Sequence, residues 1–180
     1  MTDAASARRR AQAVDVMRAF AERTGLTSTR PPERYLWTDA FAVCNFLVLG
    51  EADVALRLVD QVHHTLGQHR ADDARRGWIS GLDAREGELH PTRGGLRIGK
   101  PLPERTADEP CDDRLEWDRD GQYFHYLTRW MHALDQVARE TRQPTYRLWA
   151  RELAETAHRA FTYVVTDDRS RSRAGMYWIV

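Results

Sequence analysis

The sequence has no excess of either charge, since its 180 residues include 27 lysines and arginines and 27 aspartates and glutamates. Proteins that hold nucleic acid on a basic face usually carry a clear excess of positive charge. We therefore expect no nucleic-acid partner. Lysine itself is almost absent: Lys100 is the only one, a bias most simply explained by GC-rich coding DNA.

Long apolar runs and cysteines are also scarce. The longest apolar run, 41–49, is interrupted by Asn45 and is far shorter than the roughly 20 residues that span a membrane. Residues 1–10 carry arginines with no apolar stretch behind them, unlike a signal peptide. The two cysteines, Cys44 and Cys111, lie in unlike surroundings, so no disulfide is expected. We expect a cytoplasmic protein with no membrane partner.

Hydrophobic periodicity predicts five helices, at about 6–24, 39–49, 52–66, 122–141 and 145–161. The second is apolar almost all round and must be buried among others, whereas the third has a single apolar stripe. The same order, a rich helix followed by a sparser one, recurs in the last two. The pattern predicts an all-α fold of antiparallel helix hairpins, each with an inner and an outer helix, in one domain that covers 1–180.

The segment 77–121 between the two hairpins is a long inserted connection. It holds seven of the eleven glycines, which is typical of turns and loops. Leu96 and Ile98 alternate with polar or small residues, which predicts a short strand or a small β-hairpin there. The last five residues, 176–180, form another β-prone run that resembles the start of an element.

Each rich helix is preceded by an aromatic residue and carboxylates. Aromatic rings stack on the C–H faces of sugars, and paired carboxyl groups supply an acid, a base or a nucleophile. The positive helix ends would favour ionised carboxylates. The alternative is that these acids only cap the helices. The candidate catalytic residues are Asp39, Asp118 and Asp120, and the candidate sugar-binding aromatic residues are Trp37, Trp117 and Tyr123.

A polar stripe on the fourth helix is formed by His125, Arg129 and His132, at positions i, i+4 and i+7. It either faces solvent or lines a cavity, where histidines act as acid or base near neutral pH. We include all three as candidate substrate-binding residues. His63 and His64 are adjacent and therefore point about 100° apart on a helix, so no metal site is expected. We expect no other cofactor.

Three segments, GWISGL at 77–82, GLRIGK at 95–100 and WDRDGQYFHYLT at 117–128, resemble a group of bacterial proteins similar to the six-hairpin glycosidases. That family folds as an (α/α)-toroid of six inner and six outer helices. The resemblance implies that substrates bind where loops precede the inner helices, near Trp37, Asp39, Asp118 and Asp120. Five helices are fewer than half of a toroid, so the resemblance implies a partial toroid, as in a fragment that self-associates or lacks its C-terminal half.

We therefore expect a carbohydrate-active, glycoside hydrolase-like protein that acts on or binds a sugar at the mouth of the inner helices. One alternative is a sugar epimerase or isomerase that uses His125 and His132. Another is a non-catalytic, incomplete toroid. The apolar side chains expected to be buried together between the inner helices are Phe41, Val43, Phe46, Leu47, Leu127, Trp130, Met131 and Leu134.

Overall fold

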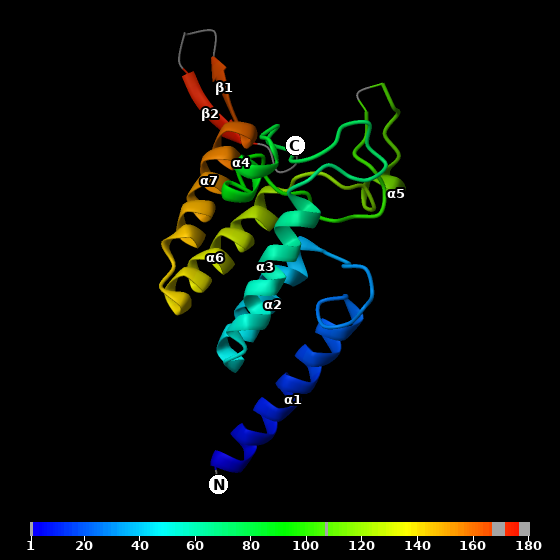
Figure 1. Cartoon of the computed structure of the whole chain (residues 1–180). Helices are drawn as coiled ribbons and strands as arrows, with labels where there is room; N and C mark the ends of the chain where they lie inside the picture. Colours follow the sequence, from blue (N-terminus) through cyan, green and yellow to red (C-terminus); the bar gives the residue numbers. More distant parts are fainter. Residues whose placement is uncertain (1, 107, 167–171, 177–180) are drawn as a thin grey trace.

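The chain is mostly helical in a computed structural model, which describes residues 2–106, 108–166 and 172–176 (Figure 1). Two antiparallel helix hairpins lie side by side. The first consists of α2 (Leu36–Leu49) and α3 (Ala52–Leu66), and the second of α6 (Phe124–Thr141) and α7 (Pro144–Phe161). The predicted all-α class is confirmed. Among the described residues, no helix is long and apolar enough to cross a membrane.

The remaining elements surround these hairpins. Helix α1 (Thr2–Arg23) projects away from the bundle (Figure 1), buries Met17 and Ala21 of its later turns in the common core, and donates a hydrogen bond from Arg10 to the Leu49 carbonyl at the end of α2. The connection between the hairpins carries α4 (Ala84–Leu89) and α5 (Asp113–Glu116). Strands β1 (Thr162–Thr166) and β2 (Ser172–Met176) follow α7 and form an antiparallel pair.

The prediction of a strand near Leu96 and Ile98 is wrong. This stretch is extended, but its backbone groups pair with the ends of helices and not with a neighbouring strand. The pair that does form, β1 with β2, includes Met176 from the predicted β-prone run at the end of the sequence. The rest of that run, 177–180, lies outside the described residues.

Each hairpin turn has a local cause in the sequence. Gly50 adopts the left-handed conformation (φ 83°), which ends α2 and lets its N–H bond to the Leu47 carbonyl. Pro144 begins α7, where a missing N–H has no consequence. Helix α2 begins at Leu36, earlier than the predicted cap at Thr38 or Asp39. The Leu36 N–H at this earlier start is satisfied by the carbonyl of Ile98, in the connection between the two hairpins.

The two inner helices, α2 and α6, pack against each other along a buried seam. Val43, Phe46, Leu127, Trp130 and Leu134 are fully buried there, as predicted, and Leu47 and Met131 pack partly buried against the same core. The prediction for Phe41 is wrong, because its side chain is 46% exposed. Helix α2 is covered where it meets α3 and α6, and Phe41 lies on its open side together with Val48, which is 77% exposed.

A buried histidine joins three of the four hairpin helices. The Trp130 indole N–H of α6 donates to Nε2 of His63 on α3, at 3.1 Å, and the Trp149 ring of α7 lies 5.0 Å from the imidazole. Nε2 is therefore the acceptor, and the neutral ring carries its proton on Nδ1. Burial lowers the pKa of His63 to about 3.

This histidine should make stability fall in acid. His63 binds a proton below about pH 6.5 in the unfolded chain, but only below about pH 3 in the folded chain. The contribution of the neutral His63 to the unfolding free energy is therefore complete above pH 6.5 and is lost as the pH falls below it. Between pH 7.5 and pH 5, the wild type should lose about 2 kcal/mol more unfolding free energy than His63→Gln, measured with urea. His132→Gln, at an exposed position, serves as control. Parallel pH profiles for wild type and His63→Gln would contradict this assignment.

Candidate functional site

The N-terminal ends of α2 and α6 lie together at one end of the bundle. The hydroxyl groups of Tyr35 and Tyr126 are 2.5 Å apart. The Trp37 ring lies 5.2 Å from the Tyr126 ring and 5.8 Å from the His125 ring. The structure thus brings together the two helix beginnings from which the sequence selected its candidate residues.

An extended stretch through Arg97 and Ile98 connects these helix ends. The Arg97 N–H donates to the carbonyl of Leu66, the last residue of α3, at 2.9 Å. The Ile98 carbonyl accepts the Leu36 N–H at the start of α2, and the Ile98 N–H donates to the carbonyl of Gly121, just before α6. Backbone groups at helix ends have no partner within their own helix, so this stretch satisfies groups that would otherwise be buried unpaired.

Asp120 reinforces the same junction from the α6 side. Its side chain is 1% exposed and accepts hydrogen bonds from the N–H groups of Gly99, at 2.8 Å, and Lys100, at 3.3 Å. It also pairs with the guanidinium groups of Arg97 and Arg70. With both oxygens engaged in this way, the carboxylate primarily holds the loop in place.

Asp39 is also buried and serves the helix itself. Its Oδ2 accepts the N–H of Tyr35, the N-cap residue of α2, at 3.0 Å, and its Oδ1 lies 3.6 Å from Arg34 Nη1. Burial raises the pKa of Asp39 to about 7, against the opposing effects of Arg34 and the Tyr35 N–H. The N–H at the helix end does favour the ionised form, as expected, but desolvation is the larger effect and the net shift is upward.

The other candidates on the loop before α6 differ in position. Asp118 is exposed and lines neither of the hollows described below. Trp117 is 76% exposed, and the ammonium group of Lys100 lies 5.0 Å from the centre of its ring. Tyr123 is half-buried, and burial raises the pKa of its hydroxyl group.

The polar stripe on α6 lies on an open face. His125, Arg129 and His132 are exposed, and they line neither hollow. The Arg129 guanidinium lies over the rings of Trp37 and Phe41, at 5.8 and 5.9 Å. These residues therefore form an aromatic and cationic surface beside the candidate site.

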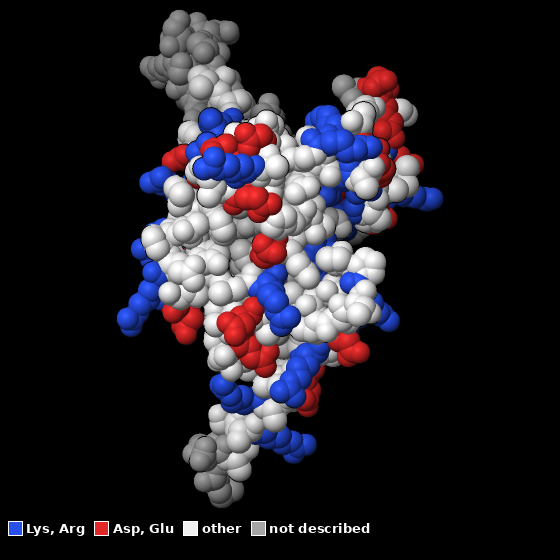
Figure 2. All heavy atoms as spheres, in the orientation of Figure 1, with Lys and Arg blue, Asp and Glu red and all other residues white. Residues whose placement is uncertain are grey.

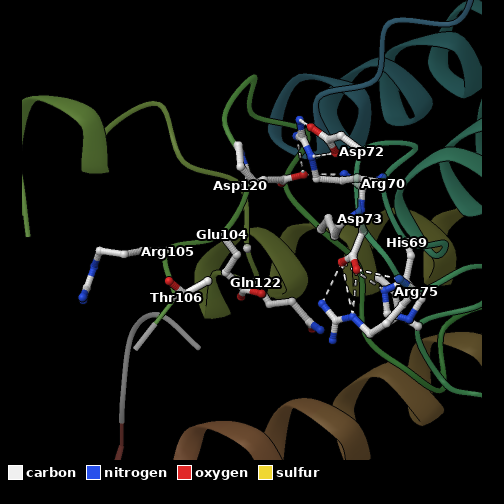
Figure 3. Close-up of a pocket in the computed structure, with 14 residues that line it drawn as sticks. His69, Arg70, Asp72, Asp73, Arg75, Glu104, Arg105, Thr106, Asp120 and Gln122 are labelled. Carbon is white, nitrogen blue, oxygen red and sulfur yellow. Dashed lines mark hydrogen bonds and ion pairs between the residues drawn. The ribbon is translucent and has the colours of Figure 1, made fainter. Parts of the chain in front are cut away.

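Two adjoining hollows open next to the helix junction. The first, which we call the polar hollow, has a volume of about 430 Å³ (Figure 3). Its lining residues are His69, Arg70, Asp72, Asp73, Arg75, Ile79, Arg97, Pro103, Glu104, Arg105, Thr106, Asp120, Gly121 and Gln122. The second, the aromatic hollow, has a volume of about 460 Å³. Its lining residues are Glu104, Arg105, Asp113, Glu116, Trp117, Arg119, Asp120, Gly121 and Tyr123.

The two hollows share four lining residues and together form what we call the groove. The shared residues are Glu104, Arg105, Asp120 and Gly121. Of the sequence-predicted site residues, the groove includes Trp117, Asp120 and Tyr123. Most of its other polar residues come from 69–75 and 103–106, for which the sequence contained no motif.

The charges of the polar hollow compensate one another. It has four arginines and four carboxylates. Arg70 holds both oxygens of Asp72, and Arg75 pairs with Asp73 at 2.8 Å (Figure 3). Charges of both signs are interspersed over the wider surface as well (Figure 2). The groove therefore presents many hydrogen-bonding groups without a strong net charge.

Glu104 differs from the arginine-paired acids of the groove in its contacts. No hydrogen bond or ion pair joins its carboxyl group to another residue in the part of the chain that the structure describes. Partial desolvation raises the pKa of Glu104, the positive charge of Arg75 opposes this rise, and the negative charges of Asp120 and Asp73 add to it, although much of the side chain is exposed. Glu104 was not among the residues predicted from the sequence, because it lies in an irregular loop at no characteristic spacing from the other acids.

The same geometry gives no support to a metal centre. Within residues 2–106, 108–166 and 172–176, no group of three His, Cys, Asp or Glu side chains is arranged to hold a metal ion. Four of the groove carboxylates, those of Asp72, Asp73, Asp120 and Glu116, are instead paired with arginines.

The different surroundings of Asp120 and Asp118 lead to a stability prediction. Asp120→Asn removes the negative charge between two guanidinium groups and should lower the unfolding free energy by about 3–5 kcal/mol. Asp118→Asn, two residues away but exposed, should change it by less than about 0.5 kcal/mol. Chemical denaturation of both variants measures the difference. Equal stabilities would show that the buried network does not hold the junction together.

Comparisons with protein-family models, with curated proteins and with solved structures gave no match. The resemblance to the six-hairpin glycosidases therefore stays a prediction. The function must be argued from the groove itself.

Proposed function

We propose that the protein binds a carbohydrate in the groove at the common end of α2 and α6. The observation that carries this proposal is the combination of one exposed and one half-buried aromatic ring with compensated charges in two adjoining hollows. A neutral sugar needs many hydrogen-bond partners and an apolar ring surface, and it needs no net charge. Trp117 and Tyr123 supply the ring surface, and the arginine–carboxylate pairs supply the partners.

The volume of the groove is in keeping with such a ligand. Each hollow is of the size usual for small-molecule sites, and the four shared residues connect them. Gln122 adds an uncharged amide, whose N–H donates to the Gly94 carbonyl at 3.0 Å. This bond orients the amide at the wall of the polar hollow.

Removing the exposed indole should weaken sugar binding. Trp117→Ala should raise the Kd for a bound oligosaccharide about tenfold, because stacking on one aromatic ring contributes roughly 1 kcal/mol or somewhat more. Phe41→Ala, which truncates an exposed aromatic side chain outside both hollows, should leave the Kd unchanged. Calorimetry with neutral glucan, mannan, xylan and galactan oligosaccharides measures both. If none of these sugars binds the wild type, the proposal fails.

A second candidate function is glycoside hydrolysis, favoured by the unlike surroundings of two acids in the aromatic hollow. Glu104 has a raised pKa, as a general acid needs, whereas Glu116 lies 3.1 Å from Arg105 and 3.5 Å from Arg119. In this mechanism Glu104 protonates the leaving glycosidic oxygen. Glu116 either takes a proton from the water that attacks the anomeric carbon, or attacks that carbon itself to form a glycosyl-enzyme that water then hydrolyses. The epimerase alternative has less support, since His125 and His132 line neither hollow.

Glu104→Gln separates binding from hydrolysis. If Glu104 is the acid, this variant should lower the rate of reducing-end release from a bound oligosaccharide at least a hundredfold while it keeps the Kd. Glu140→Gln, at an exposed position near the far end of α6, is the matched control. Hydrolysis that persists at the wild-type rate in Glu104→Gln would remove Glu104 from the mechanism. Binding without any hydrolysis by the wild type would leave a binding protein.

A further inference from the structure

Helix α4 is held between α3 and α7 by two different sets of contacts. On the α3 side, His64 Nε2 lies 2.8 and 2.9 Å from the two carboxylate oxygens of Glu88. On the α7 side, the buried Glu152 pairs with His90 at 2.6 Å and with Arg93 at 3.1 Å. These contacts fasten the short helix at both edges.

The contacts of His64 require a doubly protonated ring. Its Nδ1 lies 2.8 Å from the Asp60 carbonyl, while its Nε2 faces the Glu88 carboxylate. Both neighbours are acceptors, and a neutral imidazole has only one N–H to donate. Only the imidazolium ion can donate to both at once.

The charged groups that face His64 also favour its protonated form. Asp60 Oδ1 lies 3.3 Å from Nδ1, and Glu88 supplies the second negative charge. Burial lowers the pKa of His64, but the hydrogen bonds and charges of Asp60 and Glu88 outweigh it and raise the pKa above 6.5. Of the other neighbours, His63 is neutral, and Trp78 and Tyr146 carry no charge near neutral pH.

Helix α4 covers a tryptophan at the edge of the groove. Gly87 lies so close to Trp78 that a Cβ added there would be 2.0 Å from the indole Cδ1, and Trp78 is 5% exposed. The next residue, Ile79, lines the polar hollow. The position of α4 is therefore coupled through adjacent residues to a wall of the groove.

We propose that α4 is a pH-dependent latch, closed while His64 is protonated and released from α3 when His64 loses its proton. The neutral ring keeps one hydrogen bond and loses the other, together with its attraction to Glu88. On the α7 side, the Arg93–Glu152 ion pair and the hydrogen bond from the Trp149 indole N–H to the Leu89 carbonyl do not involve His64. The segment should therefore open on the α3 side while it stays attached to α7, and Trp78 should become accessible.

The direction of the pH effect follows from the raised pKa. A histidine whose folded pKa exceeds its unfolded value of 6.5 stabilises the closed form fully below pH 6.5. That contribution is lost as pH rises through the folded pKa. The fraction of molecules with α4 released should consequently be small in mild acid and larger in mild alkali.

Hydroxyl-radical footprinting with mass spectrometry can test this in the full chain. Between pH 6 and pH 9, the oxidation rate of Trp78 should rise about fivefold relative to exposed Trp117, as expected for a partly exposed ion pair. Trp130, which is fully buried, reports any global opening and should stay unreactive.

Two variants on opposite sides of the contact make the result decisive. His64→Gln and Glu88→Gln should each make the Trp78 rate independent of pH, whereas His158→Gln, at an exposed position on α7, should keep the wild-type profile. A constant Trp78 rate in the wild type would overturn the latch. A rise of equal size in His64→Gln or Glu88→Gln would overturn it as well.

Discussion

The hydrogen bonds of Arg97 and Ile98 are the constraint on which the rest of the structure depends. Helix ends leave N–H and C=O groups without partners, and such groups must be satisfied when they are buried. These two residues satisfy groups at the end of α3, at the start of α2 and just before α6. Because α2 and α6 begin at the same stretch, their N-terminal ends lie together, and the groove opens beside them.

The buried acids of this region have architectural roles that their positions near helix starts do not reveal. Asp120 binds two backbone N–H groups and two guanidinium groups, and it thereby ties the 97–100 stretch to the loop before α6. Asp39 holds the first turn of α2 through the Tyr35 N–H. The acids that can bind a ligand are those without partners in these networks, above all Glu104.

Two adjacent histidines show how strongly surroundings determine protonation. His63 and His64 point to different sides of α3, as neighbours on a helix must. His63 faces the indoles of Trp130 and Trp149, where burial keeps it neutral. His64 faces a carbonyl and a carboxylate at a partly exposed edge, which favour the charged ring. One contributes to the core, and the other makes the attachment of α4 depend on pH.

The elements themselves could be predicted from the sequence with few errors. Helix α3 has the predicted bounds, 52–66, and the other four predicted helices differ only in a few residues at their ends, whereas α4, α5 and β1 were not predicted. The seam residues were predicted from the apolar arcs of α2 and α6, with Phe41 as the exception. The site was predicted only in part: Trp117, Asp120 and Tyr123 line the groove, whereas Asp39, Asp118 and the α6 stripe do not.

The sequence by itself determined the helices, their pairing into hairpins and most of the core, because these depend on periodicity and turn residues that are local. Only the tertiary structure decided what covers each helix and which polar groups meet. Phe41 is exposed because no helix covers that side of α2 among the described residues. Arg70 and Asp120 meet although they are 50 positions apart. Periodicity shows which face of a helix is apolar, but contacts between distant loops depend on how the whole chain packs.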